Sequence, residues 1–248
     1  MSNSELTTRT SFRYIPFFSF SFAFTDSIIN EGQVTYETAG SLKEGKVIWL
    51  LAKMPEKKIL DDAFEPFMCF TNNHEGKGAV QVVMTPIRVV CNNTLNLALS
   101  QAKRKWSTKH MGDLNSKLEE AKHTLGMANT YMEALDVEAN RLAEFKITDV
   151  ELEQMLDELF PIDNNTTSRR KNNIETIKNA IFNCYQMPDI SQYKGTAWGI
   201  VNAVTDFVDH TAPTRNAKNY RENNWGKIIN GHDFVDKMYD KITKRIAA

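Results

Sequence analysis

The chain has 248 residues, of which 42% are hydrophobic, 25% charged and 10% aromatic. This composition excludes a wholly disordered chain, a collagen-like repeat and a small disulfide-stapled domain, and the length is sufficient to bury a core. The 30 Lys and Arg side chains against 31 Asp and Glu give a formal net charge of -1, which argues against a protein that coats nucleic acid through bulk charge alone. We therefore expect an ordinary globular protein.

The charges are unevenly distributed along the chain. Residues 113–163 hold thirteen acidic and four basic side chains, whereas the rest of the chain holds eighteen acidic and 26 basic ones. An acidic segment inside a basic remainder is consistent with a solvated or internally paired helix, and also with a surface that faces a partner.

Three cysteines, Cys69, Cys91 and Cys184, form no CxxC pair, and their odd number prevents complete internal pairing. We therefore expect reduced thiols and a cytoplasmic protein. The aromatic run 14–24 alternates with period two, as strands do, and is shorter than the ~18 apolar residues that a spanning helix needs. We expect a strand there and no membrane segment.

The first 110 residues are predicted to be strand-rich, because apolar and β-branched residues come in short runs separated by Gly, Pro and Asn. One hairpin is expected from 33–38 and 46–52, and a second pair of strands from 66–71 and 79–90. The polar residues just before Leu95 resemble a helix N-cap, which predicts a basic helix from there.

Residues 111–248 are predicted to be mostly helical and to form one integrated domain with the first part. Apolar side chains recur every three or four residues over 114–142, a heptad pattern that packs either against a later helix of the same chain or against a second subunit of a homo-oligomer. Thr148 and Glu151 match a capping box. The remaining segments are a linker over 162–168 and helices over 170–185, 196–210 and 234–246.

Strands followed by helices indicate an α+β fold. It consists of an N-terminal antiparallel sheet of hairpins and a mostly helical C-terminal half with one long heptad-patterned helix.

The segment 101–110 is the main candidate for nucleic-acid contact. Its cations surround a tryptophan, a combination that neutralises phosphates and offers a stacking face to an unpaired base. The same residues also suit the solvated end of a helix, where the macrodipole favours cations. The candidate residues, with one arginine from the preceding strand, are Arg88, Lys103, Arg104, Lys105, Trp106 and Lys109. A run from Arg169 to Lys171 adds positive charge.

The predicted helix 196–210 places polar residues opposite an apolar face. They are Trp198, Asn202, Thr205, Asp206, Asp209 and His210. Asp206 and His210 are i, i+4 neighbours that suit a structural pair, and two ligands do not make a metal site. The sequence holds no nucleophile elbow, Walker loop, HExxH or dinucleotide motif, so we predict no catalytic residue, metal or cofactor.

Three motifs stand out in combination: Glu37–Leu42 with Gly45–Lys53, then Thr85–Leu95, then Gly195–Trp198 with Asn202–Thr205 and Asp209–His210. They resemble a phage/plasmid-like family of unknown function found in phages, prophages and conjugative elements. The resemblance extends over about residues 26–245 and implies a cytoplasmic mobile-element protein. It also singles out matched positions without a known role. They are Arg88, Asn92 and Thr94 at the expected strand-to-helix junction, and Trp198, Asn202, Asp206, Asp209 and His210 on the polar face.

Two functional hypotheses follow. The first is a nonenzymatic single-stranded-DNA-binding or annealing-type accessory protein, because a sheet adjoins a basic, tryptophan-bearing segment in a mobile-element context. The alternative is an interaction module that antagonises or regulates host machinery through its acidic helix, with a host or phage protein as partner. An enzyme built around Asp206, Asp209 and His210 is a third reading.

Overall fold

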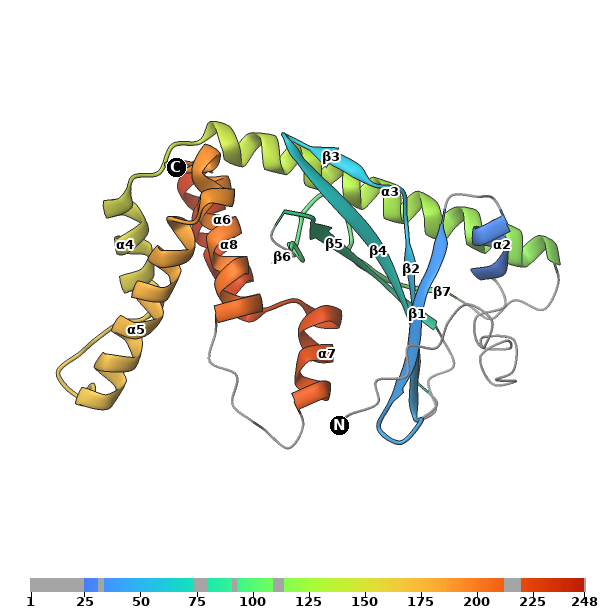
Figure 1. The fold of residues 1–248 in the computed structure, drawn as a ribbon, viewed down its shortest axis with the longest axis horizontal. Helices are drawn as coiled ribbons and strands as arrows, with labels where there is room; N and C mark the ends of the chain where they lie inside the picture. Colours follow the sequence, from blue (N-terminus) through green and yellow to red (C-terminus); the bar gives the residue numbers. More distant parts are fainter. Residues whose placement is uncertain are drawn as a thin grey trace. The chain divides into compact units, whose positions relative to one another are not determined.

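The computed structural model describes residues 25–30, 34–73, 80–90, 93–108, 114–211 and 220–247. Strands occupy the first half and helices the second, which confirms the α+β fold (Figure 1). The strand predicted over 14–24 lies outside the described residues.

The strands form an antiparallel sheet in which the order is β1-β2-β4-β5-β6, with β3 paired to β4 and β7 paired to β5. Both predicted strand pairs are present as β1 with β2 and as β4 followed by β5. The bounds are β1 (Thr35–Leu42), β2 (Val47–Lys53), β3 (Lys57–Ile59), β4 (Asp62–Asn73), β5 (Val80–Arg88), β6 (Asn93–Thr94) and β7 (Lys105–Thr108).

The helices include two that the sequence did not predict, namely the short α2 and α7, whose Asn-rich sequence lacks a clear apolar stripe. No helix in the described ranges is long and apolar enough to cross a membrane. The bounds are α2 (Thr25–Asn30), α3 (Leu114–Glu144), α4 (Asp149–Leu159), α5 (Ser168–Tyr185), a 3-10 turn (Pro188–Tyr193), α6 (Ala197–Asp206), a π turn (Phe207–Thr211), α7 (Tyr220–Asn230) and α8 (Asp233–Ala247).

The chain divides into two compact units, and β4, β5 and α3 each contribute residues to both. Unit 1 comprises Met1–Met54, Met68–Val83 and Lys105–Met127; unit 2 comprises Pro55–Phe67, Met84–Arg104 and Ala128–Ala248. Within unit 2, α6 is the central helix, because it contacts α5, α8 and β6 (Figure 1).

The helix predicted to begin at Leu95 does not form. Residues 95–104 have no helical backbone, and Lys105 begins strand β7. The backbone of this segment bonds to β5 instead, because Leu95 N donates to Pro86 O (3.0 Å) and Arg104 O accepts from Met84 N (2.8 Å). Pairing with a distant strand therefore outweighs the local N-cap signal.

The long helix α3 is confirmed, and its apolar stripe is buried within the chain. From Ala121 to Leu142, every apolar stripe residue is at most 4% exposed. The adjacent helix α4 begins with the predicted capping box, in which Thr148 and Glu151 bond each other's backbone N–H.

Part of the acidic segment is paired inside unit 2. Glu158 of α4 pairs with Lys241 of α8 (2.5 Å), and Asp157 pairs with Lys178 of α5 (2.6 Å). Such half-exposed pairs contribute about 0–1 kcal/mol each, so they fix the position of α4 more than they stabilise the fold.

Candidate functional site

A contact between strand β6 and the π turn after α6, in unit 2, brings together two residues that the motifs singled out. Thr94 N, on the short strand β6, donates to Asp209 Oδ2 in the π turn (2.7 Å). This bond joins segments 115 residues apart in the sequence. Asn92, the third junction residue, lies outside the described residues.

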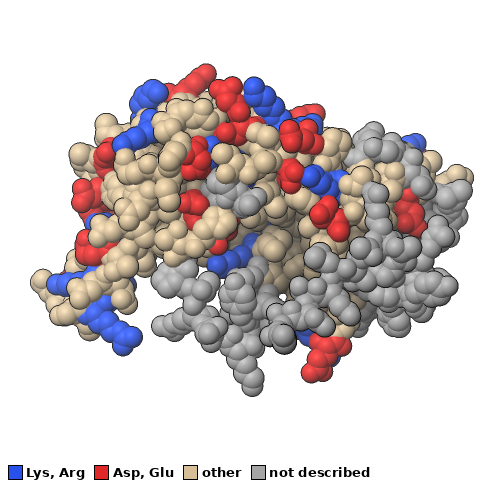
Figure 2. All heavy atoms as spheres, viewed as in Figure 1, with Lys and Arg blue, Asp and Glu red and all other residues tan. Residues whose placement is uncertain are grey.

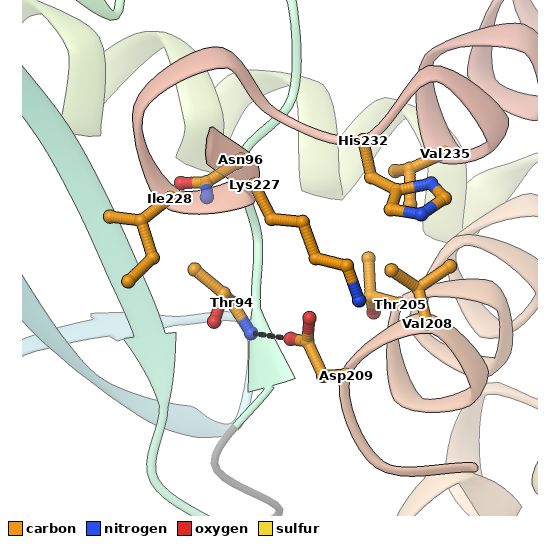
Figure 3. Close-up of a pocket in the computed structure, with 9 residues that line it drawn as sticks. All are labelled: Thr94, Asn96, Thr205, Val208, Asp209, Lys227, Ile228, His232 and Val235. Carbon is orange, nitrogen blue, oxygen red and sulfur yellow. Dashed lines mark hydrogen bonds between the residues drawn. The ribbon is translucent and has the colours of Figure 1, made fainter. Parts of the chain in front are cut away.

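A small polar pocket opens beside this bond (Figure 3). Its volume is about 30 Å³, which is room for one or two water molecules. The side chain of Lys227, from α7, extends across the pocket toward Asp209 (Figure 3). Asn96 also lines the pocket, and its Oδ1 is buried without a hydrogen-bond partner. A buried amide oxygen without a partner is costly, so this pocket suits a polar guest.

The charges around the pocket nearly balance. Desolvation raises the pKa of Asp209, while the hydrogen bonds from Thr94 and the charges of His210 and Lys227 act against the shift. Lys227 brings one positive charge to the same pocket. The described residues contain no group of three or more His, Cys, Asp or Glu side chains that could hold a metal ion. Because one carboxylate and one ammonium group face the same pocket, the arrangement favours a small neutral or dipolar guest.

His232 lines the pocket and also caps helix α8. Its Nδ1 accepts a hydrogen bond from Phe234 N (3.2 Å), which satisfies one of the free N–H groups at the helix start. Burial, followed by the nearby charge of Lys227, lowers the pKa of His232, while Asp209 and Asp233 oppose the shift. The imidazole is neutral at pH 7, and only this form leaves Nδ1 free to accept.

Replacing His232 with Asn is expected to reduce the loss of stability on acidification. As the pH falls below the unfolded value of 6.5, the unfolded chain binds a proton that the folded His232 resists, so wild-type stability declines down to the lower folded pKa. Protonation also removes the cap, which is worth about 1 kcal/mol, whereas Asn caps at every pH.

Urea denaturation at pH 7.5 and pH 5 measures this difference. The matched control is His123→Asn, because His123 is an exposed histidine on α3. It should keep the wild-type pH dependence. Equal acid sensitivity in wild type and His232→Asn would contradict the capping role.

Two of the predicted nucleic-acid contacts are internal. Arg88 is completely buried and pairs with Asp62 (2.7 Å) and Asp189 (3.2 Å). Arg104 is half-buried and donates to backbone carbonyls. These guanidinium groups hold the fold together in the described structure.

The other members of the basic segment alternate in exposure. Lys103 and Lys105 are exposed, whereas the Trp106 ring is only 8% exposed and lies opposite Val82 in the sheet. A ring this buried offers no free stacking face. Lys109 lies outside the described residues.

The polar side of α6 lies inside unit 2. Trp198, Asn202 and Thr205 are at most 1% exposed. Asn202 Nδ2 donates to Trp198 O (2.9 Å), and Thr205 Oγ1 donates to Asn202 O (2.8 Å). Asn202 and Thr205 therefore have a structural role, because these side-chain groups bond within the helix itself. The indole N–H of Trp198 is buried without a hydrogen-bond partner among the described residues.

The C-terminal end of this polar side reaches the surface. Asp206 is half-buried, and Asp209 and His210 are exposed in the π turn that follows α6. Burial, then the hydrogen bond that the thiol donates to Asp206, raises the pKa of Cys184 to about 11, so this thiol stays protonated. Cys69 is likewise buried and free, as predicted. The Asp206–His210 pair remains a prediction.

Sequence reasoning missed Asn96, Lys227 and His232. For His232 a signal was present, since Gly231-His232-Asp233 precedes the predicted final helix and places a side-chain acceptor at its first turn. Lys227 lies in a segment whose structure was not predicted, and Asn96 lies in the segment that was wrongly predicted to be a helix, so no local pattern linked them to the pocket.

The fold and the site together define an α+β protein with a polar pocket between strand β6 and the π turn after α6. A family model described as "Domain of unknown function (DUF932)" matches residues 9–225. The chain therefore belongs to this family. No curated protein and no solved structure matches it significantly.

Proposed function

We propose that this DUF932 protein is a nonenzymatic accessory protein of phages, prophages or conjugative elements that binds single-stranded DNA, in the manner of an annealing-type module. The observation that carries the proposal is the alternation along the basic segment. Lys103 and Lys105 are exposed, whereas Arg104 is half-buried and Trp106 is buried. Exposed ammonium groups are free to neutralise backbone phosphates.

The backbone that carries these lysines is well anchored. Arg104 donates to Met84 O (3.0 Å), to Ile228 O (2.9 Å) and to Ile229 O (3.0 Å). Just after these lysines in the chain, Trp106 of β7 pairs with Val82 of β5 in the sheet. An ordered backbone lowers the entropy that the segment loses on binding, which supports a contact role. The stacking role predicted for Trp106 is not part of the proposal, because its ring is buried.

A second group of cations supports the proposal. Arg169, Arg170 and Lys171 are exposed in the first turn of α5, which holds no acidic residue, and Lys and Arg side chains gather at that end of the helix (Figure 2). Cations are unfavourable at a helix N-terminus by about 0.3–1 kcal/mol each, so this placement works against stability. It suits a role in attracting anions.

The double variant Lys103→Ala/Lys105→Ala is expected to weaken binding to a labelled single-stranded oligonucleotide. Fluorescence anisotropy at several salt concentrations measures this. For single strands, each phosphate contact contributes about 0.7 to the slope of the log binding constant against the log salt concentration. The loss of two contacts should therefore reduce the magnitude of this slope by about 1.4.

The matched control is Lys122→Ala/Lys244→Ala, which removes two exposed lysines that already pair with Glu119 and Asp240. It should leave the slope unchanged. If the wild-type protein fails to bind single strands even at low salt, the proposal is wrong.

A second candidate function is favoured by the outer face of α3. Val137 is 59% exposed on this face, and Glu133 and Glu144 are exposed one and two turns away. An exposed apolar side chain among acidic ones suits a contact with a host or phage protein of complementary charge. If the protein does not bind DNA, the outer face of α3 becomes the preferred functional surface.

A further inference from the structure

Unit 2 contains a larger, apolar cavity with a volume of about 330 Å³. This volume falls within the range of small-molecule sites, which are about 300–1,000 Å³ and mostly apolar with a few polar groups. The cavity shares His232 and Val208 with the polar pocket, so the two are neighbours.

Three phenylalanines line this cavity. Phe160 caps the end of α4 and Phe234 lies in the first turn of α8, with ring centroids 5.3 Å apart. Phe207 meets Phe234 edge to face at 6.3 Å. Phe207 is buried, whereas Phe160 and Phe234 are only half-buried. Part of their surface is therefore free to contact a guest.

The edge of the cavity has one directed donor. His232 Nδ1 is occupied by Phe234 N–H, so the neutral imidazole carries its proton on Nε2. That N–H suits a carbonyl oxygen or ring nitrogen. Beyond the shared wall, Asn96 Oδ1 is buried without a partner, which marks a second position for a polar group.

Cations lie beside the cavity. Lys237 lines its rim, with a side chain that is 60% exposed and paired with Asp233. Arg170 is exposed on α5, seven residues before the lining residue Ile177. Seven residues are nearly two full turns, so Arg170 and Ile177 lie on the same face of α5, ~10 Å apart along its axis. A ligand that combines a flat ring with a phosphate would meet all of these groups.

We propose that this cavity receives one unstacked nucleobase of a bound single strand, with the base against Phe160 and Phe234 and the adjoining phosphates near Lys237 and Arg170. The inference rests on the proposed function. Base–aromatic stacking tolerates every base, which matches a nonspecific binder. An aliphatic protein side chain would use the apolar walls but neither the ring faces nor the cations.

Conservative variants distinguish a nucleobase from an aliphatic protein side chain as the guest of the cavity. Phe160→Leu and Phe234→Leu keep the cavity apolar while removing an aromatic face, and Ile177→Leu is the matched control on the same wall. The probes are an oligothymidylate that carries one 2-aminopurine, whose fluorescence reports stacking, and the same strand with abasic positions.

We expect wild type to bind the intact strand about tenfold more tightly than the abasic strand, and to change the 2-aminopurine fluorescence. Both phenylalanine variants should lose most of this difference, and Ile177→Leu should retain it. Circular dichroism and urea denaturation check that the variants are folded.

The outcomes distinguish the two proposals. No binding of either strand by folded wild-type protein overturns the proposed function. Equal binding of intact and abasic strands, or phenylalanine variants that behave as wild type, keeps DNA binding but overturns the base site. Binding of free thymidine monophosphate without any binding of the strand also overturns it, because the guest would then be a free nucleotide.

Discussion

Replacing Arg88 with Met is expected to lower the free energy of unfolding by about 3–5 kcal/mol, because it leaves a buried carboxylate without its cation. The Arg88 side chain is completely buried, and its Nε donates to Asp62 Oδ2 (2.7 Å). Its other nitrogens donate to Asp189 Oδ2 (3.2 Å) and Asp189 O (2.6 Å). The guanidinium also lies 5.7 Å from the centre of the Tyr193 ring.

Urea denaturation of two further variants tests whether the pairing causes the loss. Arg141→Met removes a 40% exposed side chain that pairs with Glu138, and it should cost less than about 1 kcal/mol. The double variant Arg88→Met/Asp62→Leu removes both members of the buried pair and should regain part of the lost stability. An Arg88→Met protein within about 1 kcal/mol of wild type would show that the cluster is not a structural centre.

Arg88 also shows what a sequence pattern leaves open. It was grouped with the basic segment 101–110 because it lies thirteen residues before that segment. Its two carboxylate partners lie 26 and 101 residues away, and no local pattern announces them. Charge clusters along the sequence do not reveal which cations face solvent.

The elements that were predicted correctly carry local signals. The capping box at Thr148 and the heptad stripe of α3 act within a few turns of one chain segment, so sequence alone revealed them. The helix expected at Leu95 had a comparable local signal and failed, because the backbone there pairs with β5. Whether a segment with a local helix signal becomes helical therefore also depends on long-range strand pairing.

The polar side of α6 is buried, in keeping with the structural role that its pattern suited. A polar stripe is normally solvent-facing, but α6 is surrounded, and Asn202 and Thr205 bond to backbone carbonyls of their own helix. The sequence singled out only some of the residues that line the pocket at Asp209, because Lys227 comes from the unpredicted helix α7.

Replacing Gly199 with Ala is expected to destabilise the protein by about 3 kcal/mol, through overpacking at the start of α6. A Cβ at this position would lie 2.3 Å from Tyr193 O and 2.9 Å from Tyr193 C. Cβ atoms do not approach backbone atoms this closely, so the backbone would have to shift. Tyr193 O is held by Thr196, whose N (3.1 Å) and Oγ1 (2.7 Å) both donate to it.

The same substitution at Gly126, in the middle of α3, should have the opposite sign. Apart from its own helix backbone, no described heavy atom lies within 4 Å of the position that its Cβ would take, so alanine there should add about 0.5–1 kcal/mol through helix propensity. At Gly199 this gain is smaller than the overpacking cost, and moving Tyr193 would also disturb the Thr196 cap of α6, which Gly199 N completes (3.1 Å). Urea denaturation of the two variants side by side measures the difference in sign. Because α6 is the central helix of unit 2, a Gly199→Ala protein as stable as wild type would mean that the α6 start adapts, and that its close contact with Tyr193 does not fix the helix in place.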